Sequence, residues 1–181
     1  MIIAPLITRL EKLTSGIPWF VQLYSRPYIK VVEREIRMAD ITHTDKVINI
    51  GCGAIPFTAV ILASRTGARV KAVDYDPRAV QCARQCVAAM GLAEQISVYQ
   101  ERGETTEADG FTAAVVALQA RPKRAIIDNL RQKGASGIKI IARCPKQSLL
   151  REYEALPVDL PVQAETLHPE MRTFDSSVLF V

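Results

Sequence analysis

Apolar residues recur with two different spacings along the chain, and the change falls near residue 45. Before that point they return at helical intervals, as Ile29, Val32 and Ile36 do. The spacing predicts helices over residues 5–13 and 28–40, with a break at 15–18. It places Pro27 near the start of the second helix. We therefore expect residues 1–42 to form a short helical appendage.

From residue 43 onward, short apolar runs alternate with amphipathic stretches. The runs predict seven strands, at 46–50, 69–76, 95–101, 112–120, 137–144, 162–168 and 174–181. The stretches between them predict helices at 56–67, 77–91, 122–134 and 147–156. Strands that alternate with helices form mainly parallel sheets covered by helices. The pattern predicts one Rossmann-like α/β domain over 43–181, with its last two strands as an antiparallel pair at the sheet edge.

Composition excludes several classes of protein. The 181 residues are enough for one domain with a core, and 49% of them are hydrophobic. The net charge is +4, but the basic residues are scattered without interleaved aromatics, so we expect no nucleic-acid partner. No apolar run approaches the roughly 20 residues of a membrane span. We expect a cytoplasmic protein that does not bind a membrane.

The four cysteines, Cys52, Cys82, Cys86 and Cys144, form no CxxC pair. The i,i+4 spacing of Cys82 and Cys86 places them on one helix face. We interpret all four as small buried hydrophobic residues in a reducing compartment, rather than as metal ligands or disulfides. No metal site is predicted.

The first strand of this domain ends at Ile50 and runs directly into Gly51-Cys52-Gly53, with Pro56 three residues later. In open parallel sheets, ligands bind beyond the carboxyl ends of the strands. Glycines there permit a tight turn and a ligand lying against bare backbone. The following helix offers free N–H groups to a carboxylate or another polar group. The loop predicts a ligand site.

Asp74 ends the second strand, 21 positions after Gly53. A carboxylate at this place can accept hydrogen bonds from both ribose hydroxyls, so the pattern favours a nucleoside. Pro56 occupies the position of the third glycine in a dinucleotide fingerprint, which disfavours a pyrophosphate. A phosphate-binding GKS or GKT segment is absent from the sequence. S-adenosylmethionine, which has a ribose and no pyrophosphate, fits these constraints.

Residues 47–63 and 72–92 resemble the core of class I S-adenosylmethionine-dependent methyltransferases. The resemblance implies that Gly51, Cys52, Gly53 and Pro56 lie under the methionine part of the cofactor. It also implies that Asp74 binds the ribose.

The same resemblance assigns further cofactor contacts. Tyr75 and Glu104 are expected to join the cofactor site, with the adenine contact within residues 100–104. Asn49 stands where many members of this family have an acidic residue. Its amide carbonyl can still accept from the ammonium group of the cofactor.

Four short segments resemble the nicotianamine synthase family more narrowly, and they come in the family's order. They are YIKVVERE (28–35), IGCGAIPFTAVILA (50–63), GIKIIARC (137–144) and LHPEMRTFDSSVLFV (167–181). That family transfers the aminocarboxypropyl arm of S-adenosylmethionine to an amine. Its members carry a helical substrate domain before the core, where this chain has about 40 residues.

Four residues outside the glycine loop are candidates for the chemistry, and the resemblance implies roles for two of them. Glu35 is the candidate base for the amine proton, and Tyr28 would orient Glu35 or the substrate. The other two are placed by the predicted strands: His168 at a strand end is a candidate base or substrate contact, and Arg143 at the carboxyl edge of the sheet could bind a substrate carboxylate. Three of the four have a structural alternative: Glu35 as a solvated helix charge, His168 as a turn residue and Arg143 in a surface ion pair.

Three functions remain open at this point. They are aminocarboxypropyl transfer to a small amine or amino acid, methyl transfer, and binding of S-adenosylmethionine without catalysis. The short N-terminal segment leaves little material to close the pocket. A partner subunit, including a homodimer, could supply the missing cover.

Overall fold

The computed structural model describes the backbone from Pro18 to the end of the chain and the side chains from Pro27 onward. Seven strands form one sheet in the order β3-β2-β1-β4-β5-β7-β6. Their bounds are β1 Lys46–Ile50, β2 Arg69–Asp74, β3 Ile96–Gln100, β4 Ala113–Val116, β5 Lys139–Pro145, β6 Ala164–Leu167 and β7 Phe174–Phe180. The predicted α/β fold with its mainly parallel seven-stranded sheet is therefore confirmed.

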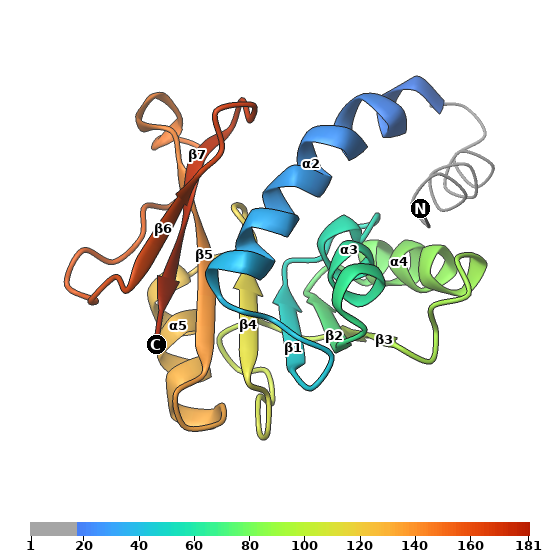
Figure 1. Ribbon diagram of the computed structural model, residues 1–181, viewed down its shortest axis with the longest axis horizontal. Helices are drawn as coiled ribbons and strands as arrows, with labels where there is room; N and C mark the ends of the chain where they lie inside the picture. Colours follow the sequence, from blue (N-terminus) through green and yellow to red (C-terminus); the bar gives the residue numbers. More distant parts are fainter. Residues whose placement is uncertain (1–17) are drawn as a thin grey trace.

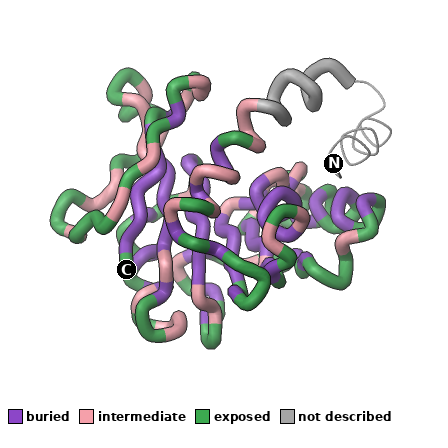
Figure 2. Tube along the Cα trace, in the orientation of Figure 1, coloured by how far each residue is buried: buried purple, intermediate pink, exposed green. Residues whose placement is uncertain are grey.

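The described helices cover both faces of this sheet (Figure 1). They are α2 Pro18–Met38, α3 Phe57–Thr66, α4 Pro77–Ala89 and α5 Lys123–Lys133, with a single 3-10 turn at Gln147–Leu149. One core layer joins α2, α3 and α4 to the sheet, and the other lies between the sheet and α5. Figure 2 shows buried backbone running along the central strands and through the inner faces of the helices.

The ends of two helices follow the predicted sequence signals. Asp76 caps α4 and Pro77 begins it, and the Asp76 side chain accepts a hydrogen bond from the Arg78 backbone N–H. Gly67 ends α3 in the left-handed conformation, with φ at 76°. Both helices pack against β1 and β2 in the same core layer.

The last two strands form the expected antiparallel pair at the edge of the sheet. β7 is antiparallel to β5 and to β6, so β6 is the outermost strand. This pairing brings Ser177 opposite Arg143 of β5. The C-terminal strand thereby enters the interior of the sheet and can contribute to a site beside β5.

The structure corrects two expectations about helices. Pro27 lies inside α2, which begins at Pro18, because the cost of one missing N–H donor does not end a helix of 21 residues. Residues 147–156 form only the 3-10 turn and not a helix. Leu150 is exposed there, and Glu154 instead accepts hydrogen bonds from the backbone N–H of Lys123, which ties the segment to the start of α5. The helix expected over residues 5–13 lies outside the described residues.

Two further expectations are corrected. β4 ends at Val116, four residues before its predicted end. The apolar pattern misled because Ala117 and Leu118 are buried in the loop that follows. Cys82 is exposed, whereas Cys52 and Cys86 are buried, because Cys82 lies outside the stripe of α4 that packs on the sheet.

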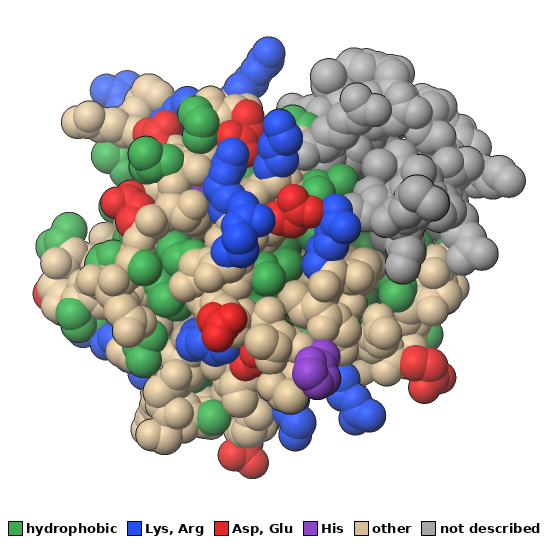
Figure 3. Space-filling model, in the orientation of Figure 1, with side chains coloured by type: hydrophobic (Ala, Val, Ile, Leu, Met, Phe, Trp, Pro, Cys, Tyr) green, Lys and Arg blue, Asp and Glu red, His purple; other side chains and the backbone are tan. Residues whose placement is uncertain are grey.

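The surface mixes charges of both signs on the face seen in Figure 3, where Lys and Arg side chains gather over α2 with Asp and Glu among them. Within the described residues, no helix is both long and apolar enough to cross a membrane. The same residues contain no group of three or more His, Cys, Asp or Glu side chains arranged to hold a metal ion.

Candidate active site

The glycine loop leaves β1 in a conformation that only glycine adopts readily. Gly51 and Gly53 have φ angles of 77° and 67°. A Cβ on Gly51 would lie 3.2 Å from the Cβ of Ala117, so the close approach to the loop after β4 also favours glycine. The predicted tight turn is present, and it places the loop at the carboxyl edge of the sheet, between the ends of β2 and β4.

Asp74 fixes the loop from the end of β2. Its Oδ2 accepts a hydrogen bond of 2.8 Å from the Gly53 N–H, and its Oδ1 accepts one of 3.0 Å from the Asp76 N–H. A carboxylate oxygen offers two lone-pair sites, so each oxygen keeps one acceptor site free. The side chain lines a pocket while holding the loop that forms the pocket wall.

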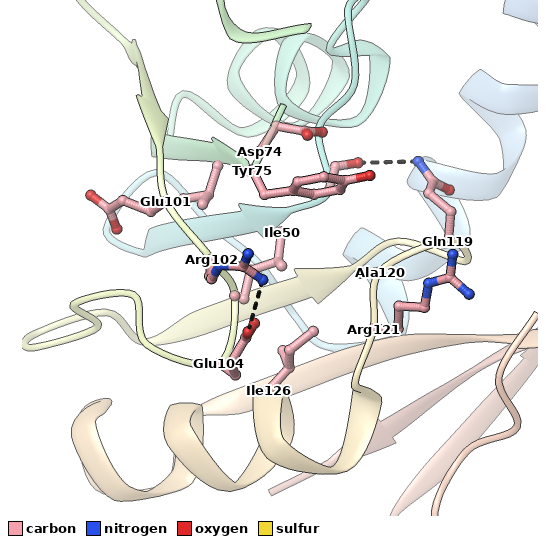
Figure 4. A pocket seen from close by; sticks show the side chains of 13 residues that line it. Ile50, Asp74, Tyr75, Glu101, Arg102, Glu104, Gln119, Ala120, Arg121 and Ile126 are labelled. Carbon is pink, nitrogen blue, oxygen red and sulfur yellow. Dashed lines mark hydrogen bonds and ion pairs between the residues drawn. The ribbon is translucent and has the colours of Figure 1, made fainter. Parts of the chain in front are cut away.

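The pocket has a volume of about 330 Å³ and lies across the ends of the first four strands in the chain (Figure 4). Four predicted residues line it: Gly51, Asp74, Tyr75 and Glu104. The Tyr75 side chain lies across the space in Figure 4, and this residue is 72% exposed. An exposed aromatic ring beside a carboxylate is suited to a ligand with a flat base and a hydroxylated sugar.

The loop after β4 forms the other wall and was missed in the sequence. Gln119, Ala120 and Arg121 line the pocket, and Gln119 Nε2 donates 3.3 Å to the Gly51 carbonyl. Buried Lys123 holds this loop through Nζ, which donates 2.6 Å to the Leu118 carbonyl and 3.4 Å to that of Ala120. Burial lowers the pKa of Lys123, and Glu154 partly opposes this. The continuing apolar run hid the loop from sequence reasoning.

Asn49, Cys52, Gly53 and Pro56 lie beside this pocket without lining it. The Cys52 thiol is buried, and burial together with the Asp74 carboxylate raises its pKa to about 12. It is therefore a neutral packing group. Asn49 Nδ2 donates 3.3 Å to the Val115 carbonyl, whereas its Oδ1 is buried without a hydrogen-bond partner among the described residues. Such an acceptor costs about 1–3 kcal/mol unless a donor reaches it.

A second cluster of polar side chains lies under α2. Glu35 is 0% exposed and Arg143 is 1% exposed, and their side chains form a two-pronged ion pair with both distances at 2.8 Å. Arg143 also donates to the Tyr28 hydroxyl, and donates 3.1 Å to Thr58 Oγ1. Although burial disfavours the charge, Glu35 and then Tyr28 raise the pKa of Arg143.

The cluster continues through β7 to the end of β6. Ser177 Oγ donates 2.7 Å to Glu35 Oε1, and His168 Nε2 lies 3.0 Å from the same hydroxyl. Thus Tyr28, Glu35 and His168, three residues selected from the sequence as catalytic, share one hydrogen-bond network. Ser177 and Thr58 were missed, because no local signal in the sequence marks either residue as part of this network.

The network excludes the structural alternatives considered for Glu35 and Arg143. Glu35 is not a solvated helix charge, and Arg143 is not in a surface ion pair. The glycine loop connects the cluster to the pocket, because Gly51 lines the pocket and residue 57 begins α3, whose first turn contains Thr58. The assigned roles of the individual residues stay predictions.

Comparison with known proteins decides the family. A family model described as nicotianamine synthase protein matches residues 17–169. The chain belongs to the nicotianamine synthase family. The resemblance carried by four short segments is therefore confirmed.

Curated relatives are similar to part of this nicotianamine synthase family member. A protein from Yersinia pestis named L-histidine 2-aminobutanoyltransferase is 31% identical over 132 residues, which cover 67% of this chain and 49% of that protein. A protein of the same name from Pseudomonas aeruginosa is 26% identical over 121 residues, covering 66% and 46%. The chain spans about half the length of the curated relatives it matches.

Solved structures share the fold. A mutant of MtNAS in complex with S-adenosylmethionine superposes with a TM-score of 0.79 at 20% identity, covering 97% of this chain and 72% of that one. An RNA methyltransferase from Salinibacter ruber in complex with S-adenosyl-L-homocysteine gives 0.67 at 18% identity, covering 83% and 89%. This chain thus shares its overall fold with MtNAS and with a methyltransferase.

Proposed function

We propose that this chain binds S-adenosylmethionine and transfers its aminocarboxypropyl arm to the amine of a small, amino-acid-like acceptor. The observation that carries the proposal is the buried network of Glu35, Tyr28 and Arg143, next to the glycine loop of a nicotianamine synthase family member. A carboxylate held away from water suits an amine that must lose a proton.

The residues around the pocket fit S-adenosylmethionine. Asp74 has one free acceptor site on each oxygen, matching the two ribose hydroxyls. Tyr75 offers an exposed ring to the adenine. Asn49 has a buried Oδ1 without a partner beside the pocket, at the position where the methyltransferase resemblance expects an acceptor for the ammonium group. The geometry at Asp74 and Tyr75 supports the cofactor independently of the family match.

The chain's own residues divide the work of the reaction. S-adenosylmethionine supplies a carbon bonded to a positive sulfur, so an amine displaces methylthioadenosine and loses one proton. Glu35 accepts this proton, Arg143 holds its carboxylate in place, and the Tyr28 hydroxyl in turn holds Arg143. The substrate-binding role predicted for Arg143 stays a prediction, because four internal hydrogen bonds occupy its guanidinium. Their geometry supports a role in positioning Glu35.

The name of the curated relatives supports an amino acid as acceptor, with L-histidine as the first compound to test. We propose a cytoplasmic setting, which the four free cysteines support.

Identification of the nucleoside product tests the proposal. The protein is incubated with S-adenosylmethionine and L-histidine or other amino acids, and the nucleosides are separated by liquid chromatography. Arm transfer releases methylthioadenosine, the expected result. Methyl transfer releases S-adenosylhomocysteine and would contradict the proposal. Tight binding of S-adenosylmethionine with neither product would identify a binding module instead.

A further inference from the structure

The hydroxyl of Ser177 lies between Glu35 and His168 in the interior, and all three residues are 0% exposed. It is 2.7 Å from Glu35 Oε1 and 3.0 Å from His168 Nε2. None of these hydrogen bonds is needed to pair the strands, since β7 is already joined to β5 and β6 by backbone bonds. The three side chains therefore form a row of polar groups that ends at the proposed base, Glu35.

The donors and acceptors of these three side chains determine where the protons of the network lie. A carboxylate only accepts, so Ser177 must donate its single hydroxyl proton to Glu35. The hydroxyl must then accept from His168, which places the imidazole proton on Nε2. His168 Nδ1 is left bare and accepts from Arg34 Nη1 at 3.4 Å. Every contact of the ring agrees with this one neutral tautomer.

The same count separates the two oxygens of Glu35. Oε1 accepts from Arg143 Nε and from Ser177, so both of its lone-pair sites are taken. Oε2 accepts only from Arg143 Nη2 and keeps one site free. A proton arriving at this carboxylate has Oε2 as its available acceptor.

We propose that Ser177 and His168 are positioning residues that saturate Glu35 Oε1 and so direct the proton of the attacking amine to Oε2. The inference rests on the proposed function. In the step concerned, an N–H bond of the amine breaks and an O–H bond forms at Oε2. The nitrogen keeps the electron pair for its new bond to carbon, and Glu35 becomes neutral.

The charged groups around Glu35 and His168 favour the same positions of the protons. Arg143, Tyr28 and Arg34 face the carboxylate and the imidazole from β5 and α2, and Arg34 is itself paired with Glu170. Burial lowers the pKa of His168, with Glu35 opposing it and the two arginines adding to it. The ring is thus kept neutral, as the tautomer requires.

Paired serine variants separate positioning from packing. Ser177→Ala removes the donor to Oε1, whereas Ser176→Ala removes the hydroxyl of a neighbouring buried residue on the other face of β7. We expect Ser177→Ala to lower kcat by about tenfold, the usual effect of one hydrogen bond to a charged group. We expect the KM for S-adenosylmethionine to stay within about twofold of the wild-type value, because binding of S-adenosylmethionine does not use this hydrogen bond.

The pH profile gives a readout that packing alone would not move. Loss of a donor to the carboxylate favours its protonated form, so the acid limb of the kcat profile moves to higher pH in Ser177→Ala. His168→Gln, which keeps a donor near the Nε2 position, retains more activity than His168→Ala. An unchanged profile in Ser177→Ala, or equal losses in Ser177→Ala and Ser176→Ala, would overturn the inference.

Nitrogen NMR of the histidine rings tests which ring nitrogen of His168 carries the proton. The chain has two histidines, His168 and the exposed His43, so the buried ring can be assigned with a His43→Gln variant. We expect shifts of a neutral ring with the proton on Nε2; a proton on Nδ1 would overturn the inference. If the wild type makes no methylthioadenosine, the proposed function fails and the proton transfer to Oε2 with it. If it does and Ser177→Ala behaves as wild type, only the inference fails.

Discussion

The guanidinium of Arg143 on β5 binds the carboxylate of Glu35 on α2 through two hydrogen bonds of 2.8 Å. The two residues are 108 positions apart in the sequence and are almost completely buried. The pair therefore joins α2, which precedes the sheet in the sequence, to β5. It also sets the position of the proposed base relative to the glycine loop.

Breaking this pair should destabilise the protein strongly. Arg143→Met leaves the Glu35 carboxylate buried without its partner, and we expect a loss of about 3–5 kcal/mol in the free energy of unfolding. Arg124→Met, which removes an exposed ion pair on α5, is the matched control and should have a much smaller effect. Urea denaturation measures both, and equal losses for the two variants would contradict the buried pairing.

The double variant Glu35→Gln, Arg143→Met tests whether the loss comes from the uncompensated charge. Because neither buried charge remains, we expect it to be more stable than Arg143→Met alone. Additive losses from the two single variants would show that the side chains act independently.

Asp74 should control affinity for S-adenosylmethionine. Asp74→Ala removes the acceptor for the ribose and leaves the N–H of Gly53 without its partner. We expect binding to weaken by roughly 10- to 100-fold, equivalent to one or two hydrogen bonds to a charged group. Isothermal titration measures the change, with the exposed Asp128→Ala as control. Wild-type affinity in Asp74→Ala would remove the basis for this nucleoside site.

Lys123 should matter for the same binding without touching the pocket. Its Nζ holds the carbonyls of Leu118 and Ala120, and the latter residue lines the pocket. Lys123→Met frees this loop, and we expect affinity for S-adenosylmethionine to fall by about three- to tenfold, the effect of one lost hydrogen bond. Lys133→Met, at the other end of α5, should leave the affinity unchanged. An unaltered affinity in both variants would mean that the loop is held by other contacts.

The cysteines should differ sharply in their rates of alkylation. Cys82 is exposed, whereas burial raises the pKa of Cys52 to about 12 and that of Cys86 to about 11. Since only the thiolate reacts, we expect maleimide at about pH 8 to modify Cys82 first, with Cys52 and Cys86 protected until the protein unfolds. Peptide mass spectrometry over time measures the order. Early modification of Cys52 would contradict the described loop.

The strands and the edge of the sheet could be predicted because their signals are local. The apolar run ending at Ile50, the glycines after it and Asp74 at the next strand end all lie within one βαβ unit. The start of α4 at Pro77, where the sequence predicted it, depends on an equally local signal. Parallel-sheet topology then brings these elements to one edge.

The network under α2 could be predicted only in part, because it depends on long-range pairing. The family resemblance selected Glu35, and strand-end positions selected Arg143 and His168, but their contacts require α2, β5 and β6 to meet. Ser177 links them and carries no local signal of its own. The loop after β4 was missed for the opposite reason, since its apolar residues imitate a longer strand.

The fate of isotopic label tests the central claim most directly. S-adenosylmethionine is supplied with carbon label either in the carboxyl group of its methionine part or in the methyl group, together with L-histidine and other amino acids. We predict that carboxyl label appears in the amino-acid product and that methyl label stays in methylthioadenosine. We also expect Glu35→Gln largely to abolish the formation of both products. Methyl label on the acceptor, with carboxyl label left in S-adenosylhomocysteine, would contradict these predictions.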